Sequence, residues 1–206
     1  MRSREAKGIA TTVSTATTPW WNPSSLMCSA MPSDLPHDDR IVVRRPPAVA
    51  PAAGSLGLEL FQNAYVVRDL DAAMEQIGAS FGVRKFTMVP VPPLDGGATL
   101  RIALAWCAGQ MIELIEARGP GLELHATWLP EGADIRFHHN GYFVRNEREW
   151  ADLLQKLAEE GRPIVMSGDS GFIRYAYVYA AELGHYLEFV LPNADGKAFF
   201  ENVAAN

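Results

Sequence analysis

Residues 61–73 read FQNAYVVRDLDAA, and they predict a strand followed directly by a helix. The apolar run is followed by Asp69, a residue type that caps the N-terminus of helices well. A second stretch, residues 138–147, reads HHNGYFVRNE and has Asn146 in the place of Asp69. The chain therefore begins the same strand-and-helix unit twice.

Three further strand-like segments follow each of these beginnings. They are residues 85–89, 100–107 and 110–116 in the first unit, and residues 163–167, 173–180 and 186–191 in the second. Units 58–118 and 135–192 therefore share the order β-α-β-β-β, which indicates a structural duplication. Two such sheets packed edge to edge would bring equivalent positions toward one central cleft.

The first quarter of the chain has a different composition. Residues 1–55 are rich in Ser, Thr, Pro and Ala and have no sustained period of 2 or 3.6, so we expect a disordered arm and linker. A transit-like peptide and a gene start placed too early are the alternatives. We expect residues 56–192 to form one domain and residues 193–206 to form a C-terminal tail.

The bulk composition excludes several classes of protein. An apolar content of 48% and a charged content of 20% are ordinary for a soluble globular protein. The net charge of −6 argues against nucleic acid or an anionic membrane surface as a partner. No apolar stretch approaches the ~20 residues that a membrane helix needs. Only two cysteines occur, which fits a reducing cytoplasm as the location.

Polar side chains occur inside four of the apolar runs. They are Gln62, Glu113, His139 and Glu188. A buried polar group costs several kcal/mol unless it is paired or binds a metal. One amide oxygen, one imidazole and two carboxylates form a plausible ligand set for a hard or borderline divalent cation. The first two residues lie in one unit and the other two in the second, which suggests one shared site.

Each of these residues has a simpler explanation, such as a backbone hydrogen bond, a salt bridge or an exposed strand face. Glu116 is a rival to Glu113, but the alternation of side chains along a strand sends it to the other face. For the same reason we expect His138 and His139 to point to opposite faces, so that only one can be a ligand. The spacing to the helix cap favours His139.

Four segments, taken in order, resemble the vicinal oxygen chelate superfamily of glyoxalases and bleomycin-resistance proteins. They are residues 61–73, 111–115, 138–144 and 184–190. The resemblance implies an α+β fold with a curved, eight-stranded mixed sheet around a metal in a central cleft. It also implies ligands from the first and last strand of each unit, here Gln62, Glu113, His139 and Glu188. This set is similar to that of eukaryotic-type glyoxalase I, with zinc, nickel, cobalt or manganese as the divalent ion.

The activity that the resemblance implies is that of a lyase, isomerase or epimerase that stabilises an enediolate of a small carbonyl substrate. Glu188, or else Glu113, would act as the general base by loosening from the metal. Glyoxalase I grips glutathione through an arginine and an asparagine, where this chain has Val66 and Ala117. We therefore expect a substrate that is not linked to glutathione, and a homodimer as the candidate assembly.

Two other functions remain open at this point. A ligand-binding protein without turnover is favoured by the weak donor Gln62 and by the stripe of Tyr175, Tyr177 and Tyr179, which we expect to be core or dimer contact unless it faces the cleft. A ring-opening iron dioxygenase needs two histidines and one carboxylate, and here Gln62 replaces one of the histidines. The loop of residues 90–97 is a lid, a rim or a plain connection. We assign no catalytic role to His125 or Trp128.

Overall fold

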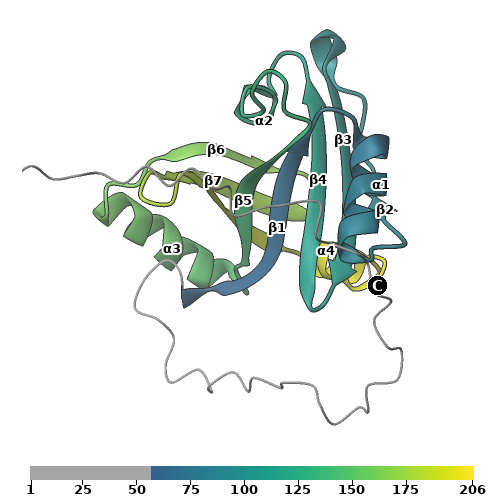
Figure 1. Cartoon of the computed structure of the whole chain (residues 1–206). Helices are drawn as coiled ribbons and strands as arrows, with labels where there is room; N and C mark the ends of the chain where they lie inside the picture. The colour runs from purple at the N-terminus through teal and green to yellow at the C-terminus, as the bar shows by residue number, and fades with distance from the viewer. Residues whose placement is uncertain (1–56) are drawn as a thin grey trace, which may run out of the picture. The chain divides into compact units, whose positions relative to one another are not determined.

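The computed structural model describes residues 57–206, which build one eight-stranded sheet with its two long helices on the outer side (Figure 1). The arm expected over residues 1–55 lies outside the described residues. Within the described range, no helix combines the length and the apolar character that crossing a membrane requires.

The strands and helices follow the predicted order, with two short helices added. The strands are β1 (Glu59–Val67), β2 (Thr87–Met88), β3 (Thr99–Cys107), β4 (Gln110–Arg118), β5 (Ile135–Phe143), β6 (Ile164–Asp169), β7 (Ile173–Ala180) and β8 (His185–Pro192). The helices are α1 (Leu70–Phe81), α2 (Glu123–Ala126), α3 (Glu147–Glu159) and α4 (Ala194–Glu201), with a 3₁₀ turn η4 (Asp95–Gly97). Helices α2 and α4 have no counterpart among the predicted elements.

The strand order is β2-β3-β4-β1-β5-β8-β7-β6, so each unit supplies four neighbouring strands. The units join where β1 pairs antiparallel with β5. Within the units, β1 pairs parallel with β4, and β5 pairs parallel with β8. The α+β class and the mixed, curved sheet are therefore confirmed, and the first and last strand of each unit lie side by side at its centre.

The two long helices begin where the sequence predicts. The Asp69 side chain accepts a hydrogen bond from the Ala72 backbone N–H at 3.0 Å, and Asn146 accepts one from Glu149 at 3.0 Å. Gly82 ends α1 in the left-handed conformation that glycine adopts readily, with φ of 74°. These caps satisfy N–H groups that would otherwise lack partners at the helix ends.

Each long helix covers the outer face of its own half of the sheet (Figure 1). Leu70 and Ile77 of α1 pack with Leu114 of β4, and Leu157 of α3 packs with Leu187 of β8. Fully burying a leucine contributes about 1.5–3 kcal/mol, so these contacts fix which face of each strand turns outward. The side chains of the other face are left to line the cleft.

The C-terminal residues are part of this packing. Residues 193–206, expected as a tail, contain α4, whose Phe200 is buried together with Phe61 and Leu104. The indole N–H of Trp106 donates to the Phe200 carbonyl at 3.0 Å. The segment therefore covers one end of the inner face of the sheet.

The same residues explain why β2 is shorter than predicted. An extended β2 would pair Lys85 with Trp106, because Thr87 pairs with Leu104. Instead, Trp106 forms a bridge with Ala205 and donates its backbone N–H to Ala204. The C-terminal residues thus occupy the edge of β3 that a longer β2 would need.

Candidate metal centre

Three of the four predicted ligands meet at the centre of the sheet. Glu113 of β4 and His139 of β5 both pair with Ala64 of β1, one on each side of it. The small side chain of Ala64 leaves the space between them open. Glu188 of β8 lies beyond β5, and its carboxylate returns over the strand toward His139.

The distances within this group suit one ion. The Nε2 atom of His139 lies 3.1 Å from Oε2 of Glu188 and 3.3 Å from Oε2 of Glu113. All three donor atoms lie within 4.8 Å of one another. Two donors about 2.1 Å from a metal, at octahedral to tetrahedral angles, are about 3.0–3.4 Å apart. This buried Glu-His-Glu group could therefore bind a metal ion.

Gln62 is held beside this group by a glycine. Gly141 of β5 pairs with Gln62 of β1 on one side and with Glu188 of β8 on the other. A Cβ atom on Gly141 would lie 2.5 Å from Oε1 of Gln62, so the amide oxygen rests in the space that a side chain would fill. Gln62 also lines the same cavity as Glu113 and Glu188. The structure thus gathers all four predicted residues, although binding of a metal by them stays a prediction.

The charge of the buried group is unbalanced without a cation. Oε2 of Glu113 makes no hydrogen bond of good geometry with the described residues, and its contact is the 3.3 Å ion pair with Nε2 of His139. Burial raises the pKa of this carboxyl more than His139 lowers it. Burial alone lowers the pKa of His139, but the charges and hydrogen bonds of Glu188 and Glu113 outweigh it and raise the pKa to about 9. The buried group therefore favours a bound proton or another cation, and an oxygen whose one contact is a 3.3 Å ion pair fits a metal ligand.

His138 lies beside His139 rather than on the opposite face. Their Nδ1 atoms are 2.8 Å apart, and both rings contact the ring of Tyr177. The expectation of opposite faces is wrong because strand alternation fails here. Ala64 pairs with His139 but Tyr65 pairs with Phe137, which leaves His138 as the extra residue of a β-bulge.

The tyrosine stripe of β7 does reach the cleft. Tyr177 pairs with Glu188 across β7 and β8 and is buried. Burial raises the pKa of Tyr177 well above its usual value, and the charge of Glu188 raises it further. Tyr175 lines the same cavity, whereas Tyr179 is exposed and contacts Trp128. The alternative in which the stripe faces the cleft therefore holds for two of the three residues.

Glu116 faces the other side of the sheet, as expected. Its Oε2 accepts a hydrogen bond from the Leu70 backbone N–H at the start of α1, and its carboxylate forms ion pairs with Arg101 and Arg118 at 3.0 and 2.7 Å. Glu116 therefore anchors a helix and takes no part in the central group.

A cavity of about 320 Å³ opens from the central group, and most of its walls are apolar. Leu100, Ile102 and Leu104 of β3 form one wall, and Phe199 and Phe200 near the C-terminus form another. The loop after β2 contributes as well, so it forms a rim of the cavity. Among the described residues that line it, none is Lys or Arg, and the two acidic ones are Glu113 and Glu188.

His125 of α2 lines this cavity too, although no catalytic role was expected for it. Its ring is buried, its Nδ1 atom has no hydrogen-bond partner among the described residues, and burial lowers its pKa to about 4. The ring stacks on His138, with centroids 4.7 Å apart. Because α2 lies in the connection between the two units, no strand or helix pattern pointed to this residue.

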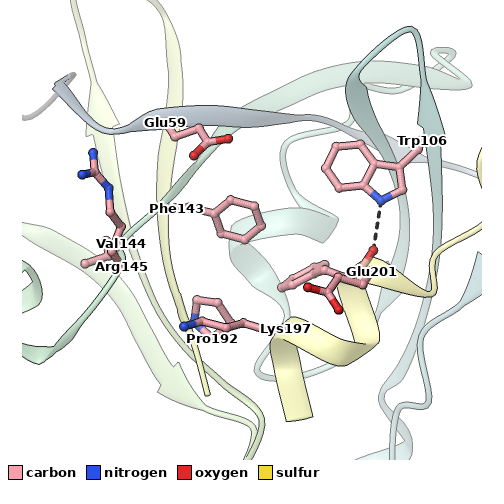
Figure 2. Close-up of a pocket in the computed structure, with 9 residues that line it drawn as sticks. Glu59, Trp106, Phe143, Val144, Arg145, Pro192, Lys197 and Glu201 are labelled. Atoms are coloured by element: carbon pink, nitrogen blue, oxygen red, sulfur yellow. Dashed lines mark hydrogen bonds between the residues drawn. The ribbon is translucent and has the colours of Figure 1, made fainter. Parts of the chain in front are cut away.

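A second, larger cavity of about 410 Å³ shares Phe200 with the first (Figure 2). Figure 2 shows Trp106 and Phe143 around it, together with charged residues such as Arg145 and Lys197. None of the three clustered ligands lines it. The first cavity is therefore the candidate site despite its smaller size.

Comparison with known proteins identifies the fold. No family model matches the chain, and no curated protein matches it in sequence. Among solved structures, it is similar to methylmalonyl-CoA epimerase from Mycobacterium tuberculosis, with a TM-score of 0.51 and 19% identity over 71% of this chain and 95% of that one. It is also similar to hypothetical protein BH1468 from Bacillus halodurans C-125, with a TM-score of 0.50 and 15% identity over 66% of this chain and 94% of that one. At these identities the similarity shows a shared fold and leaves the activity open.

Proposed function

We propose that this protein, which has the vicinal oxygen chelate fold, is a metal-dependent lyase, isomerase or epimerase that moves a proton on the carbon next to a carbonyl group. The observation that carries the proposal is the convergence of Glu113, His139 and Glu188 beside a cavity that both carboxylates line, with Oε2 of Glu113 making no hydrogen bond of good geometry. Such a group is costly to bury unless it is paired or binds a metal.

Gln62, Glu113, His139 and Glu188 would hold the ion. Nitrogen and oxygen donors of this kind suit zinc, nickel, cobalt or manganese. When bound, the ion supplies a Lewis acid that stabilises the negative charge developing on a substrate oxygen. The neutral amide of Gln62 adds no charge to the site, so two carboxylates would balance a divalent ion.

The proton would be moved by Glu188 or Glu113, both of which line the cavity. Their surroundings differ in a way that experiment can separate. Glu188 lies 3.1 Å from Nε2 of His139 and pairs with Tyr177 across β7 and β8. Glu113 has an oxygen whose one contact is the 3.3 Å ion pair with His139, and burial raises the pKa of Glu113 toward the range in which a general base works best near neutral pH.

The substrate is proposed to be an apolar carbonyl compound that is not linked to glutathione. The walls of the cavity offer no cationic side chain to a charged peptide-like substrate among the described lining residues. Val66 is buried with Ile115 on the inner face of the sheet, and Ala117 packs against the same cluster. The two positions that would grip glutathione thus belong to an apolar cluster and offer no polar group to it, which supports this substrate class.

A deuterium-exchange experiment tests the proposal. Zinc-, nickel-, cobalt- and manganese-loaded protein would be incubated in D₂O with a panel of apolar ketones, aldehydes and acyl thioesters, and exchange next to the carbonyl followed by NMR. We expect exchange in at least one compound, its loss in Glu188→Gln or Glu113→Gln, and its retention in Glu75→Gln, an exposed carboxylate on α1. Metal-loaded protein that binds these compounds without exchange would instead support a ligand-binding protein.

A further inference from the structure

The hydrogen bonds of His138 determine which of its two ring nitrogens carries the proton. Its Nε2 atom lies 3.1 Å from the backbone carbonyl oxygen of Leu124. A carbonyl oxygen can only accept, so Nε2 of His138 carries a proton. The ring is fully buried, and no carboxylate among the described residues forms an ion pair with it, so a second proton would leave an uncompensated buried charge.

The proton on His138 decides the state of His139. A neutral imidazole has one donor and one acceptor nitrogen, so Nδ1 of His138 accepts. The Nδ1 atom of His139, 2.8 Å away, must therefore donate. In neutral His139 the lone pair then lies on Nε2, the atom that faces Glu188 and Glu113 at 3.1 and 3.3 Å.

We propose that His138 is a positioning residue that fixes His139 in the tautomer whose Nε2 binds the metal. This role rests on the proposed function, because it concerns the same metal centre. Metal-binding histidines generally donate their second ring N–H to a carboxylate, a carbonyl or water, which sets the ring orientation. Here the neutral imidazole of His138 accepts the second N–H of His139, so no third carboxylate is needed beside Glu113 and Glu188.

The fold holds His138 in place from two directions. The β-bulge in β5 puts its ring beside His139 instead of on the opposite face. Helix α2 supplies His125, whose ring stacks on it with an interplanar angle of 28°, and the preceding Leu124 supplies the carbonyl. Helix α2, in the connection between the two units, thus helps to set the proton position on His139.

A matched pair of variants tests the hydrogen bond separately from packing. Asparagine and leucine have nearly the same shape, but only the asparagine in His138→Asn offers an oxygen that can accept from Nδ1 of His139. We expect His138→Leu to weaken zinc binding 10- to 100-fold in a competition titration, and His138→Asn to stay within a few-fold of the wild type. Thermal melts of the metal-free proteins identify any variant that has not folded.

Proton positions in the wild-type protein give a second readout that needs no variant. In two-bond ¹H–¹⁵N spectra, His138 should carry its proton on Nε2 with or without zinc. His139 should carry its proton on Nδ1 and have Nε2 ligated when zinc is bound. A proton on Nδ1 of His138 would overturn the proposal.

The outcomes separate this inference from the proposed function. Zinc binding by His138→Leu equal to that of the wild type, or equal losses in both variants, would overturn the role of His138 alone. A wild-type protein that binds neither zinc nor cobalt would overturn the metal centre, and with it this role.

Discussion

Gly141 lies directly under the side chain of Gln62, so close that a Cβ atom on the glycine would lie 2.5 Å from Oε1 of the amide. The missing side chain is what allows Gln62 to lean over β5 toward Glu188, which pairs with the same glycine from the other side. One ligand position therefore depends on the size of a residue that binds nothing itself.

The Gly141→Ala substitution should displace Gln62. We expect it to lower the free energy of unfolding by about 1–3 kcal/mol, because the extra methyl group overpacks a buried position. It should also weaken metal binding. The Gln62→Gly substitution in the same background removes the opposing atoms, so urea denaturation of the double variant should recover part of the lost stability. Additive losses would show that the two residues are not coupled.

The wild-type protein should carry about one divalent ion per chain. Elemental analysis after reconstitution should show reduced occupancy in His139→Ala and Glu188→Gln, and unchanged occupancy in the surface control Glu75→Gln. Bound metal should also raise the thermal midpoint, because a ligand at 100 times its Kd stabilises the folded state by about 2.7 kcal/mol. Identical melts with and without a chelator would contradict the metal centre.

The metal-free protein should lose stability as the pH rises from about 6.5 to 9. His139 has a folded-state pKa of about 9 against an ordinary 6.5, so its stabilising proton is fully bound below 6.5 and is lost through 9. The raised pKa of Glu113 acts in the same direction. A shift of this size corresponds to on the order of 3 kcal/mol. Urea denaturation in a chelator at several pH values should show this loss, and His139→Gln should flatten it.

Metal affinity should change with pH in the opposite direction. The proton on Nε2 of His139 competes with the metal for the same lone pair, so zinc binding should tighten as the pH rises. Competition titrations at pH 6, 7 and 8 would measure this. An affinity that is independent of pH would indicate that His139 is not a ligand.

The glutathione hemithioacetal of methylglyoxal should be a poor substrate. Val66 and Ala117 belong to an apolar cluster, and a site that lacks polar partners for a charged substrate discriminates poorly in its favour. Lactoyl-thioester formation should therefore be weak or absent. A kcat/KM in the ~10⁴–10⁸ M⁻¹s⁻¹ range typical of enzymes on their own substrates would overturn this prediction.

The duplicated units and their helices could be predicted from the sequence because they depend on neighbours along the chain. The caps at Asp69 and Asn146 and the alternation that separates Glu113 from Glu116 are local patterns, and the structure agrees with each. The curved, eight-stranded sheet was instead implied by the resemblance to the vicinal oxygen chelate superfamily. The packing of α4 could not be, because Phe200 is buried against residues of β1 and β3 that lie far away in sequence.

The sequence by itself determined which donors are available to a metal and that they come from two equivalent halves. Only the tertiary structure decided how they are oriented. The bulge that turns His138 toward His139 arises from a register mismatch between β1 and β5, which lie in different units. Tyr177 reaches Glu188 only because β7 pairs with β8 in one register. Such contacts depend on which strands pair and where, and no spacing within a single strand encodes that.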